Sequence, residues 1–233
     1  MDKLVRKIEV PLAKKRMEEA GLYLVDPKEL EKLADVAMDA YKDYPLHNWL
    51  SSGKYDEKAS KLIMLISLKT MTKDAVIYAD SPEMNGFAIW LPFGFEGSKT
   101  IPFLMNGALK LIAHSGFSIL GRMITYENFA MKLKKKYTDN VDWYLYNLSI
   151  KKDAQGKGIA SKLMKPMLEF CDQEAMKCYL ETNKESNVSL YEHYGFELKE
   201  TALVPKSDVT HYSMVRAPKK VNTEGEKKED DQK

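Results

Sequence analysis

Cysteine is scarce in this sequence, and its histidines do not cluster with it. The 233 residues contain two cysteines, Cys171 and Cys178, and four histidines. No cysteine–histidine cluster accompanies them, so the sequence predicts neither a disulfide framework nor a zinc site. Because a chain without disulfides suits a reducing compartment, we expect a cytoplasmic protein that holds no metal.

A long hydrophobic run is also missing. The first residues, MDKLVRKIEVPL, lack the continuous apolar core of a secretory signal. The most apolar region, near residues 104–120, is interrupted by Lys110 and His114. The sequence therefore predicts neither export nor a membrane span.

An excess of either charge is absent as well. The chain has 36 Lys and Arg against 34 Asp and Glu, which leaves a net charge of +2 and disfavours a nucleic-acid partner. A hydrophobic content of 44% is ordinary for a soluble globular protein, and we expect one domain over residues 1–216. Residues 217–233 have almost no apolar side chains and are predicted to be disordered. The oligomeric state stays open.

The most informative segment is residues 144–160, YLYNLSIKKDAQGKGIA. Its alternating apolar residues predict a strand, and Gly156, Gly158 and Ala160 then open a helix. Small residues let backbone N–H groups converge at a helix N-terminus, where unpaired donors and the helix dipole favour a phosphate. Neither GxxxxGK[ST] nor GxGxxG occurs, which disfavours an NTPase or a dinucleotide dehydrogenase. The turn instead has the pattern Q-x-x-G-x-A, and we expect it to hold a pyrophosphate.

The N-terminal half alternates helical and strand patterns. Apolar residues at helical spacing predict helices at about 28–41 and 57–71, and two strand-like runs at 75–80 and 86–91 predict an antiparallel hairpin. Residues 44–50, YPLHNWL, are predicted to be an aromatic connection that either packs or lines a pocket.

A loop and a helical segment follow the hairpin. Residues 91–97, LPFGFEG, are either a mobile loop that covers a ligand or a plain connector. Residues 100–137 are predicted to form two helices, an insertion of the kind in which a shared fold often carries its specificity. Downstream, the sequence predicts a helix over 156–176, a strand over 178–182, a short helix ending at Gly195 and two closing strands. Together these elements predict a mixed α/β (α+β) fold.

Two motifs resemble the signature of a known family. Residues 148–160, followed by Asn187 and LYEHYGF at 190–196, resemble the GNAT superfamily of acetyl-CoA-dependent N-acetyltransferases. The resemblance covers residues 140–216 well and the N-terminal half by element order alone. It implies a central, mostly antiparallel sheet flanked by helices, whose fourth and fifth strands splay apart.

The resemblance also implies acetyl-CoA as cosubstrate, with its amide-rich arm pairing along the fourth strand as an added strand would. The acceptor would be a primary amine of a small molecule or peptide that attacks the thioester directly. The residues implied to bind acetyl-CoA are Leu148, Ser149, Ile150, Gln155, Gly156, Lys157, Gly158, Ile159, Ala160 and Asn187.

Transfer to an amine calls for an acid and a base. Tyr191 stands at the tyrosine of LYEHYGF, which in many similar acetyltransferases points at the cofactor sulfur, and a phenol pKa near 10 suits donation to a thiolate. Its alternative role is packing, and Tyr194 shares roughly the same helix face as packing partner or as the acid itself.

The base is harder to place. Some similar acetyltransferases have a carboxylate early in the fourth strand, where this chain has Tyr144, and this puts a base on that strand in doubt. Glu181 is the candidate base, or else a solvated strand end. No motif places a histidine, and each is expected to be structural or exposed; they are His47, His114, His193 and His211.

Three classes of function remain. An amine acetyltransferase is favoured. A CoA-binding regulatory or degenerate module would keep the phosphate turn without turnover, and a nucleic-acid-associated protein is disfavoured by the balanced charge.

Overall fold

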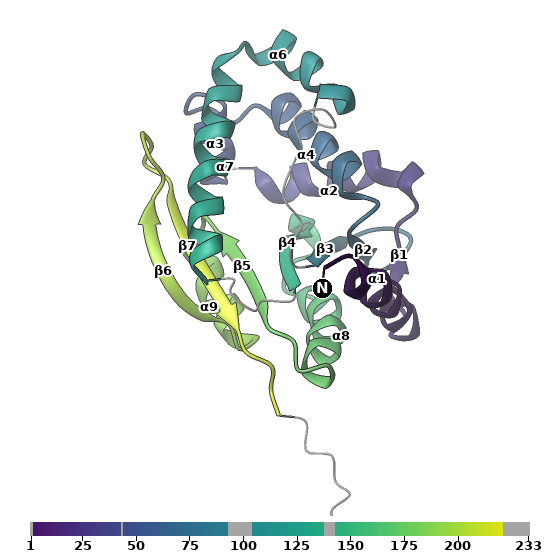
Figure 1. The fold of residues 1–233 in the computed structure, drawn as a ribbon. Helices are drawn as coiled ribbons and strands as arrows, with labels where there is room; N and C mark the ends of the chain where they lie inside the picture. The colour runs from purple at the N-terminus through teal and green to yellow at the C-terminus, as the bar shows by residue number, and fades with distance from the viewer. Residues whose placement is uncertain (1, 43, 93–103, 138–142, 221–233) are drawn as a thin grey trace, which may run out of the picture.

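A computed structural model describes residues 2–42, 44–92, 104–137 and 143–220. Within these residues one seven-stranded sheet has the order β1-β2-β3-β4-β5-β7-β6 (Figure 1). Its strands are β1 (Tyr23–Leu24), β2 (Val76–Ala79), β3 (Gly86–Pro92), β4 (Trp143–Ile150), β5 (Cys178–Thr182), β6 (Glu197–Leu203) and β7 (Thr210–Arg216). Only β4 and β5 pair in parallel, and every other neighbouring pair is antiparallel.

Helices flank this sheet. They are α1 (Asp2–Glu19), α2 (Leu30–Tyr41), α3 (Pro45–Leu50), α4 (Glu57–Met71), α6 (Leu109–Ser115), α7 (Ser118–Tyr137), α8 (Ile159–Gln173) and α9 (Ser186–His193), with short helical turns η1 (Pro27–Glu29), η2 (Leu104–Ala108) and η3 (Lys152–Ala154). The predicted mixed fold is confirmed. In the described parts of the chain, no helix is both long and apolar enough to cross a membrane.

Two hydrophobic clusters lie on opposite faces of the sheet. Along β3, Ala88 and Trp90 belong to the cluster that includes α1, α8 and α9, whereas Phe87 and Ile89 belong to the cluster that includes α2 and α4. Because successive strand residues point to opposite faces, a strand covered on both sides is buried throughout, as β3 is. Figure 1 shows α1 and α8 neighbouring each other on one side.

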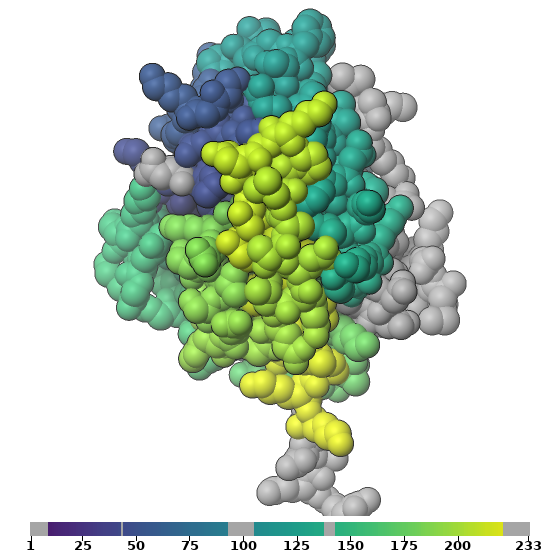
Figure 2. All heavy atoms as spheres, turned by 90° about the vertical axis from the view of Figure 1, so that its left-hand side faces the viewer, coloured from purple at the N-terminus to yellow at the C-terminus, as the bar shows by residue number. Residues whose placement is uncertain are grey.

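The helical segment that follows β3 closes the opposite side. Its described part holds η2, α6 and α7, and α7 packs on β7. Figure 2 shows this arrangement from outside, with the β6–β7 hairpin in the middle of the face and α7 along its edge. The segment 91–97, considered as a loop that covers a ligand, lies almost entirely outside the described residues, as does most of the tail predicted to be disordered.

Several predicted elements differ in detail. The connection predicted at residues 44–50 is helix α3, with Pro45 at its start, where the missing N–H removes no helical hydrogen bond. Helix α8 begins at Ile159 rather than Gly156, because Gly158 is in the left-handed conformation and cannot belong to a right-handed helix. The helix predicted at 57–71 is confirmed as α4.

A bulge in β4 turns two consecutive side chains to the same side. In the β3–β4 register Ile89 lies opposite Asn147 and Trp90 opposite Leu145, so Tyr146 is the extra residue. A bulge re-aims the side chains of its strand. Tyr146 consequently joins the cluster on the α2–α4 side, and Asn147 on the same side donates a hydrogen bond to the hydroxyl of Tyr41 on α2.

Strands β4 and β5 separate beyond a short paired region. They pair only where Trp143, Tyr144 and Leu145 face Cys178, Tyr179 and Leu180. From Tyr146 onward, the β5-facing edge of β4 has no strand partner among the described residues. The predicted splay of the fourth and fifth strands is therefore confirmed, because the two strands are paired only at their first three residues.

Candidate active site

The predicted phosphate turn lies at the N-terminus of α8, beside the splay. Gly156 and Gly158 have positive φ angles of 75° and 79°, a conformation that disfavours residues with a Cβ. A Cβ built on either glycine would meet no heavy atom within 4 Å, so the space above the turn is open. No side chain caps α8 at Gly158. Backbone N–H groups of this first turn are therefore available to an anion.

The other residues of the turn support this arrangement. Gln155 donates through Nε2 to the carbonyl of Ile150, at 3.1 Å, which ties the turn to the end of β4. Lys157 is exposed beside it, and Ile159 packs against the cluster of the α1–α8 face. Asn187, on α9, donates through Nδ2 to the hydroxyl of Thr182 at 3.1 Å, so its amide joins α9 to the end of β5.

The unpaired edge of β4 runs from the sheet toward this turn. Leu148 and Ile150 pack against the cluster on the α8 side. The Ser149 hydroxyl turns the other way and donates to Oδ1 of Asn147 at 2.9 Å. Since that side chain is occupied and buried, residues 148–150 offer backbone groups, rather than a polar side chain, to whatever enters the splay.

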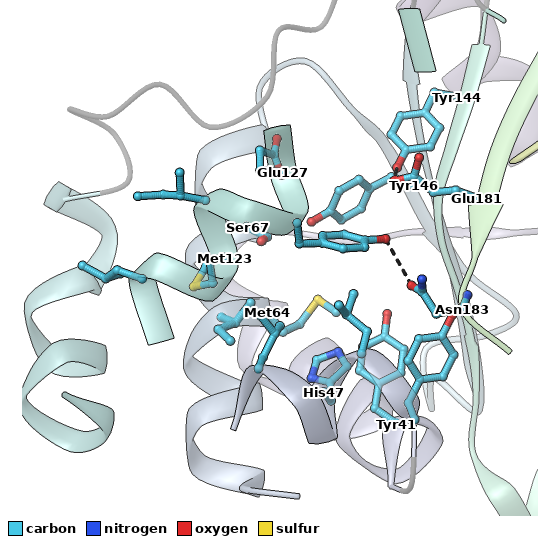
Figure 3. Close-up of a pocket in the computed structure, with 17 residues that line it drawn as sticks. Tyr41, His47, Met64, Ser67, Met123, Glu127, Tyr144, Tyr146, Glu181 and Asn183 are labelled. Atoms are coloured by element: carbon cyan, nitrogen blue, oxygen red, sulfur yellow. Dashed lines mark hydrogen bonds between the residues drawn. The ribbon is translucent and has the colours of Figure 1, made fainter. Parts of the chain in front are cut away.

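A cavity of about 430 Å³ lies on the opposite face of the splay (Figure 3). Its walls come from α2, α3, α4, α7, β4 and the end of β5. Five of the lining residues are tyrosines, namely Tyr41, Tyr44, Tyr126, Tyr144 and Tyr146. The apolar lining residues are Leu46, Leu50, Ile63, Met64, Leu120, Met123 and Ile124. The remaining ones are His47, Ser67, Glu127, Glu181 and Asn183.

Glu181, the base candidate, lies in this cavity where β5 leaves β4. Its Oε1 accepts a hydrogen bond from the Tyr144 hydroxyl at 3.0 Å, and its Oε2 accepts one from the Tyr179 hydroxyl at 3.1 Å. The Nε2 atom of His211 is 3.8 Å from Oε2. Glu181 is therefore a fixed carboxylate in the cavity wall rather than a solvated strand end.

Tyr44 joins the two strand ends and the cavity. Its hydroxyl lies 3.1 Å from Oγ1 of Thr182 and accepts a hydrogen bond from the backbone N–H of Asn183 at 2.9 Å. Asn183 also accepts from the Tyr126 hydroxyl at 3.1 Å, the contact drawn in Figure 3. The end of β5 is thus bonded to Tyr44, which directly precedes α3, and to Tyr126 on α7.

Comparison with known proteins finds a domain match and a relative. The model of the GNAT acetyltransferase domain matches residues 116–198, which span α7, β4, the glycine turn, α8, β5 and α9. An uncharacterised N-acetyltransferase of Schizosaccharomyces pombe is 24% identical over 208 residues, covering 83% of this chain and 82% of the relative. Residues 116–198 therefore match the GNAT acetyltransferase domain, and the chain is similar to an N-acetyltransferase over most of its length.

Solved GNAT structures share its fold. One described as histone acetyltransferase HPA2 and related acetyltransferase, from Corynebacterium glutamicum, has a TM-score of 0.53 and 15% identity, covering 86% of this chain and 97% of its own. Arylalkylamine N-acetyltransferase 2 of Aedes aegypti also has a TM-score of 0.53, with 17% identity over 84% of this chain and 97% of its own.

In this GNAT domain, Tyr191 lies on the α8 side of the splay. The side chain is 7% exposed and packs in the cluster of that face, with its ring centroid 6.1 Å from that of Phe196. Burial raises the pKa of the phenol, and the nearby hydroxyls of Tyr44 and Tyr194 raise it further. Tyr191 is thus a neutral phenol. Tyr44, which influences the pKa of Tyr191, lines the cavity on the other face of the sheet.

Tyr194 has a different environment. Its hydroxyl lies 3.0 Å from Oγ of Ser161 on α8, and its carbonyl accepts a hydrogen bond from Nε of Arg216. For the Tyr191 hydroxyl, no such partner is found among the described residues. The hydroxyl of Tyr194 therefore joins α9 to α8, and that of Tyr191 is the freer of the two.

Glu127 on α7 is a cavity residue that sequence reasoning missed. The side chain keeps exposed surface because it faces the open cavity, but surrounding protein atoms restrict the hydration of its carboxylate. This partial burial raises its pKa, the charge of Glu181 raises it further, and Lys134 opposes the shift. Only its position on α7 at helical spacing from Met123 could have indicated that both face the same way.

The four histidines all contact other side chains of the protein. His47 lines the cavity but is buried, with Nδ1 2.9 Å from the hydroxyl of Ser60, and burial lowers its pKa to about 4. His211 is fully buried beside Ser213, and burial lowers its pKa as well. His114 lies 3.0 Å from the carboxylate of Asp56. His193 ends α9 and stacks edge-on against Tyr194.

Proposed function

We propose that this GNAT protein transfers the acetyl group of acetyl-CoA to a primary amine by direct attack. One observation carries the proposal: the β4–β5 splay lies between an open glycine turn on the α8 side and a cavity with a fixed carboxylate on the other. An acetyl donor bound on one side can meet an amine bound on the other only where the two strands separate.

The residues around the glycine turn fit acetyl-CoA. The backbone N–H groups of residues 156–160 would hold the pyrophosphate, because no Cβ occupies the space at Gly156 or Gly158. The unpaired edge at residues 148–150 would pair with the amide-rich arm, and the Asn187 side chain lies at the end of β5. When bound, acetyl-CoA supplies an acetyl thioester.

Glu181 would receive the proton that the acceptor ammonium loses. Two tyrosine hydroxyls hold its carboxylate at the point where β5 leaves β4. A base must be within hydrogen-bond reach of the proton that it removes, and the position of Glu181 in the cavity wall beside the splay supports this role. Glu127 adds a second negative charge in the cavity, which would help to hold the cation.

Tyr191 would supply a proton to the departing thiolate. Its phenol is neutral and has no hydrogen-bond partner among the described residues. The raised pKa makes it a weaker acid than a free phenol, and a thiolate is already a fair leaving group, so its contribution should be modest.

The direct test is release of free thiol from acetyl-CoA across a panel of amines, with mass spectrometry of the product. We expect thiol release that depends on the amine, together with a product one acetyl group heavier. Glu181→Gln should lower kcat/KM by about 10²-fold or more, because loss of a general base costs about 10²–10⁴-fold, while acetyl-CoA binding persists.

Glu169→Gln is the matched control, because Glu169 is exposed on α8 away from the cavity. It should leave kcat/KM and acetyl-CoA binding unchanged. Binding of acetyl-CoA without thiol release from any amine would instead support a CoA-binding module without turnover. Equal activity of Glu181→Gln and the parent would remove Glu181 from the role of base.

A further inference from the structure

Building on the proposed function, we infer that the acceptor is a hydrophobic primary monoamine. Its single ammonium group would lie near Glu181 and Glu127, and its alkyl or aryl body would contact the tyrosine rings and the apolar side chains of α3, α4 and α7 (Figure 3). Three features of the cavity lead to this class: its charge, its remaining polar capacity and the distribution of its apolar residues.

The charge of the cavity favours a cation. Among the described residues that line it, Glu127 and Glu181 are the acidic ones, and neither a lysine nor an arginine is present. His47 is neutral at physiological pH, because burial lowers its pKa to about 4. An amine that also has a carboxylate or a phosphate would thus meet two negative charges in the lining, whereas Lys134, the cation beside Tyr144, is not a lining residue. The cluster already attracts one cation, since Nζ of Lys134 lies 4.6 Å from the ring centroid of Tyr144.

Most hydrogen-bonding groups of the cavity already bond to other groups of the protein. The Tyr144 hydroxyl donates to Glu181, that of Tyr126 donates to Asn183, and that of Tyr44 is bonded at the end of β5. Tyr41 accepts from Asn147, and Tyr146 bonds with Ser67. The tyrosines consequently offer ring faces more than free hydroxyls. An amino sugar, whose many hydroxyls need partners when buried, would leave several of them unsatisfied.

The apolar residues lie away from Glu181. One face of α7 lines the cavity with residues spaced three and four apart, namely Leu120, Met123, Ile124 and Glu127. The apolar residues of this face come first along the helix, and Glu127 follows them. Facing them, α4 contributes Ile63 and Met64. No described lining residue of this part has a carboxylate, so a second ammonium there would lose hydration without gaining an ion pair. A volume of about 430 Å³ is within the range of small-molecule sites.

The sharpest test compares hexylamine with 1,6-diaminohexane, which differ in chain end: a methyl group in one, an ammonium group in the other. We expect kcat/KM for hexylamine to exceed that for the diamine by at least about tenfold, given that apolar pockets discriminate by about 10–200-fold per small group. 2-Phenylethylamine should rank with hexylamine, and glucosamine should rank far below both. A diamine turned over as fast as hexylamine, or a short lysine peptide turned over faster, overturns the inference.

A variant tests where the discrimination arises. Met123→Glu places a carboxylate one helical turn before Glu127, so it should reduce the hexylamine preference by about tenfold through an ion pair with the second ammonium. Met105→Glu is the matched control, because Met105 is 81% exposed on η2 outside the cavity, and it should leave the preference unchanged. If Met123→Glu does not fold, the order of kcat/KM values for the amines in the parent protein still tests the inference.

Failure of the two proposals can be told apart. If no amine releases thiol, the proposed function is wrong, and calorimetric titration of the CoA-loaded protein with hexylamine and 1,6-diaminohexane then reports on the cavity alone. Tighter binding of hexylamine supports the inferred class of ligand. Tighter binding of the diamine, or no binding of either, overturns it.

Discussion

The two sides of the β4–β5 splay are built in contrasting ways. On the α8 side, one continuous segment of six residues, 155–160, forms the turn, and it offers backbone groups of glycines with open space above them. On the other side, side chains from six elements far apart in the sequence line the cavity, and most of their polar atoms are bonded to one another.

This difference teaches how each side can recognise a ligand. Backbone N–H groups at a helix N-terminus bind any phosphate, whichever side chains surround them, so the turn can serve one fixed cosubstrate. A cavity of tyrosine, methionine and leucine side chains selects by shape and charge, and single substitutions can change that selection. Variants on the two sides should therefore have separable effects.

The largest effect is expected on the turn. Acetyl-CoA at 100 times its Kd should raise the Tm of the parent by about 5–10 °C, from a binding contribution of about 2.7 kcal/mol in a protein of this size. Gly158→Asp should abolish this shift, because its carboxylate would occupy the space that the pyrophosphate needs and repel it. Thermal denaturation with and without acetyl-CoA measures both.

Gly53→Asp controls for backbone strain in that experiment. Gly53 also has a positive φ, 89°, with nothing within 4 Å of a built Cβ, but it lies between α3 and α4. It should lower Tm as Gly158→Asp does and keep the shift with acetyl-CoA. A full shift in Gly158→Asp would show that the turn is not the phosphate site.

An intermediate effect is expected at the splay itself. Tyr191→Phe keeps the ring and its burial, so kcat should fall by about 10²-fold or less while Tm and acetyl-CoA binding stay unchanged. Tyr194→Phe should show the opposite pattern. Loss of the contact with Ser161 should cost about 1 kcal/mol of stability, or about 2–4 °C in Tm, with turnover retained.

Steady-state kinetics measures kcat, and thermal denaturation measures Tm, for both variants. The acid assignment is wrong if Tyr191→Phe keeps full kcat while chemistry is rate-limiting. Loss of folding in Tyr191→Phe would instead show that this hydroxyl serves packing.

The smallest effect is expected at Glu127, on the cavity side. Burial and the charge of Glu181 raise its pKa in the folded protein, so the unfolded chain releases this proton more readily and ionisation destabilises the fold. Glu127→Gln should therefore raise Tm slightly at neutral pH, by about 1–2 °C. The gain should disappear below the unfolded pKa of about 4.3, where both states are protonated.

Acceptor binding should respond in the opposite direction. Glu127→Gln should raise KM for a cationic amine at neutral pH, because one of the two negative charges is lost. In the parent, KM should rise as the pH falls through the raised pKa of Glu127, and this dependence should be absent in the variant. Thermal scans and KM measured from pH 4 to pH 8, with Glu169→Gln as control, test both; a Tm unaffected at every pH would show that Glu127 is fully hydrated.

The sequence by itself determined the glycine turn, the side of the splay that is formed by consecutive residues. The pattern from Gln155 to Ala160 predicted a helix N-terminus with phosphate-binding geometry, because glycine conformation and unpaired helix N–H groups are properties of consecutive residues. Helical periodicity placed α4 correctly, and the GNAT resemblance predicted the splay. The same resemblance singled out Tyr191, and Glu181 was chosen for its place at the end of the predicted fifth strand, although the partners of both were not visible in the sequence.

Only the tertiary structure decided the cavity side. The bulge at Tyr146 is a matter of pairing between β3 and β4, and without it Tyr146 and Asn147 would point to opposite faces. The charge of Glu181 reaches Glu127 because α7 packs against β7. Helical spacing by itself cannot predict which element a helix face will pack against. Side-chain packing between distant segments therefore determined which residues form the cavity, whereas backbone conformation within one segment determined the turn.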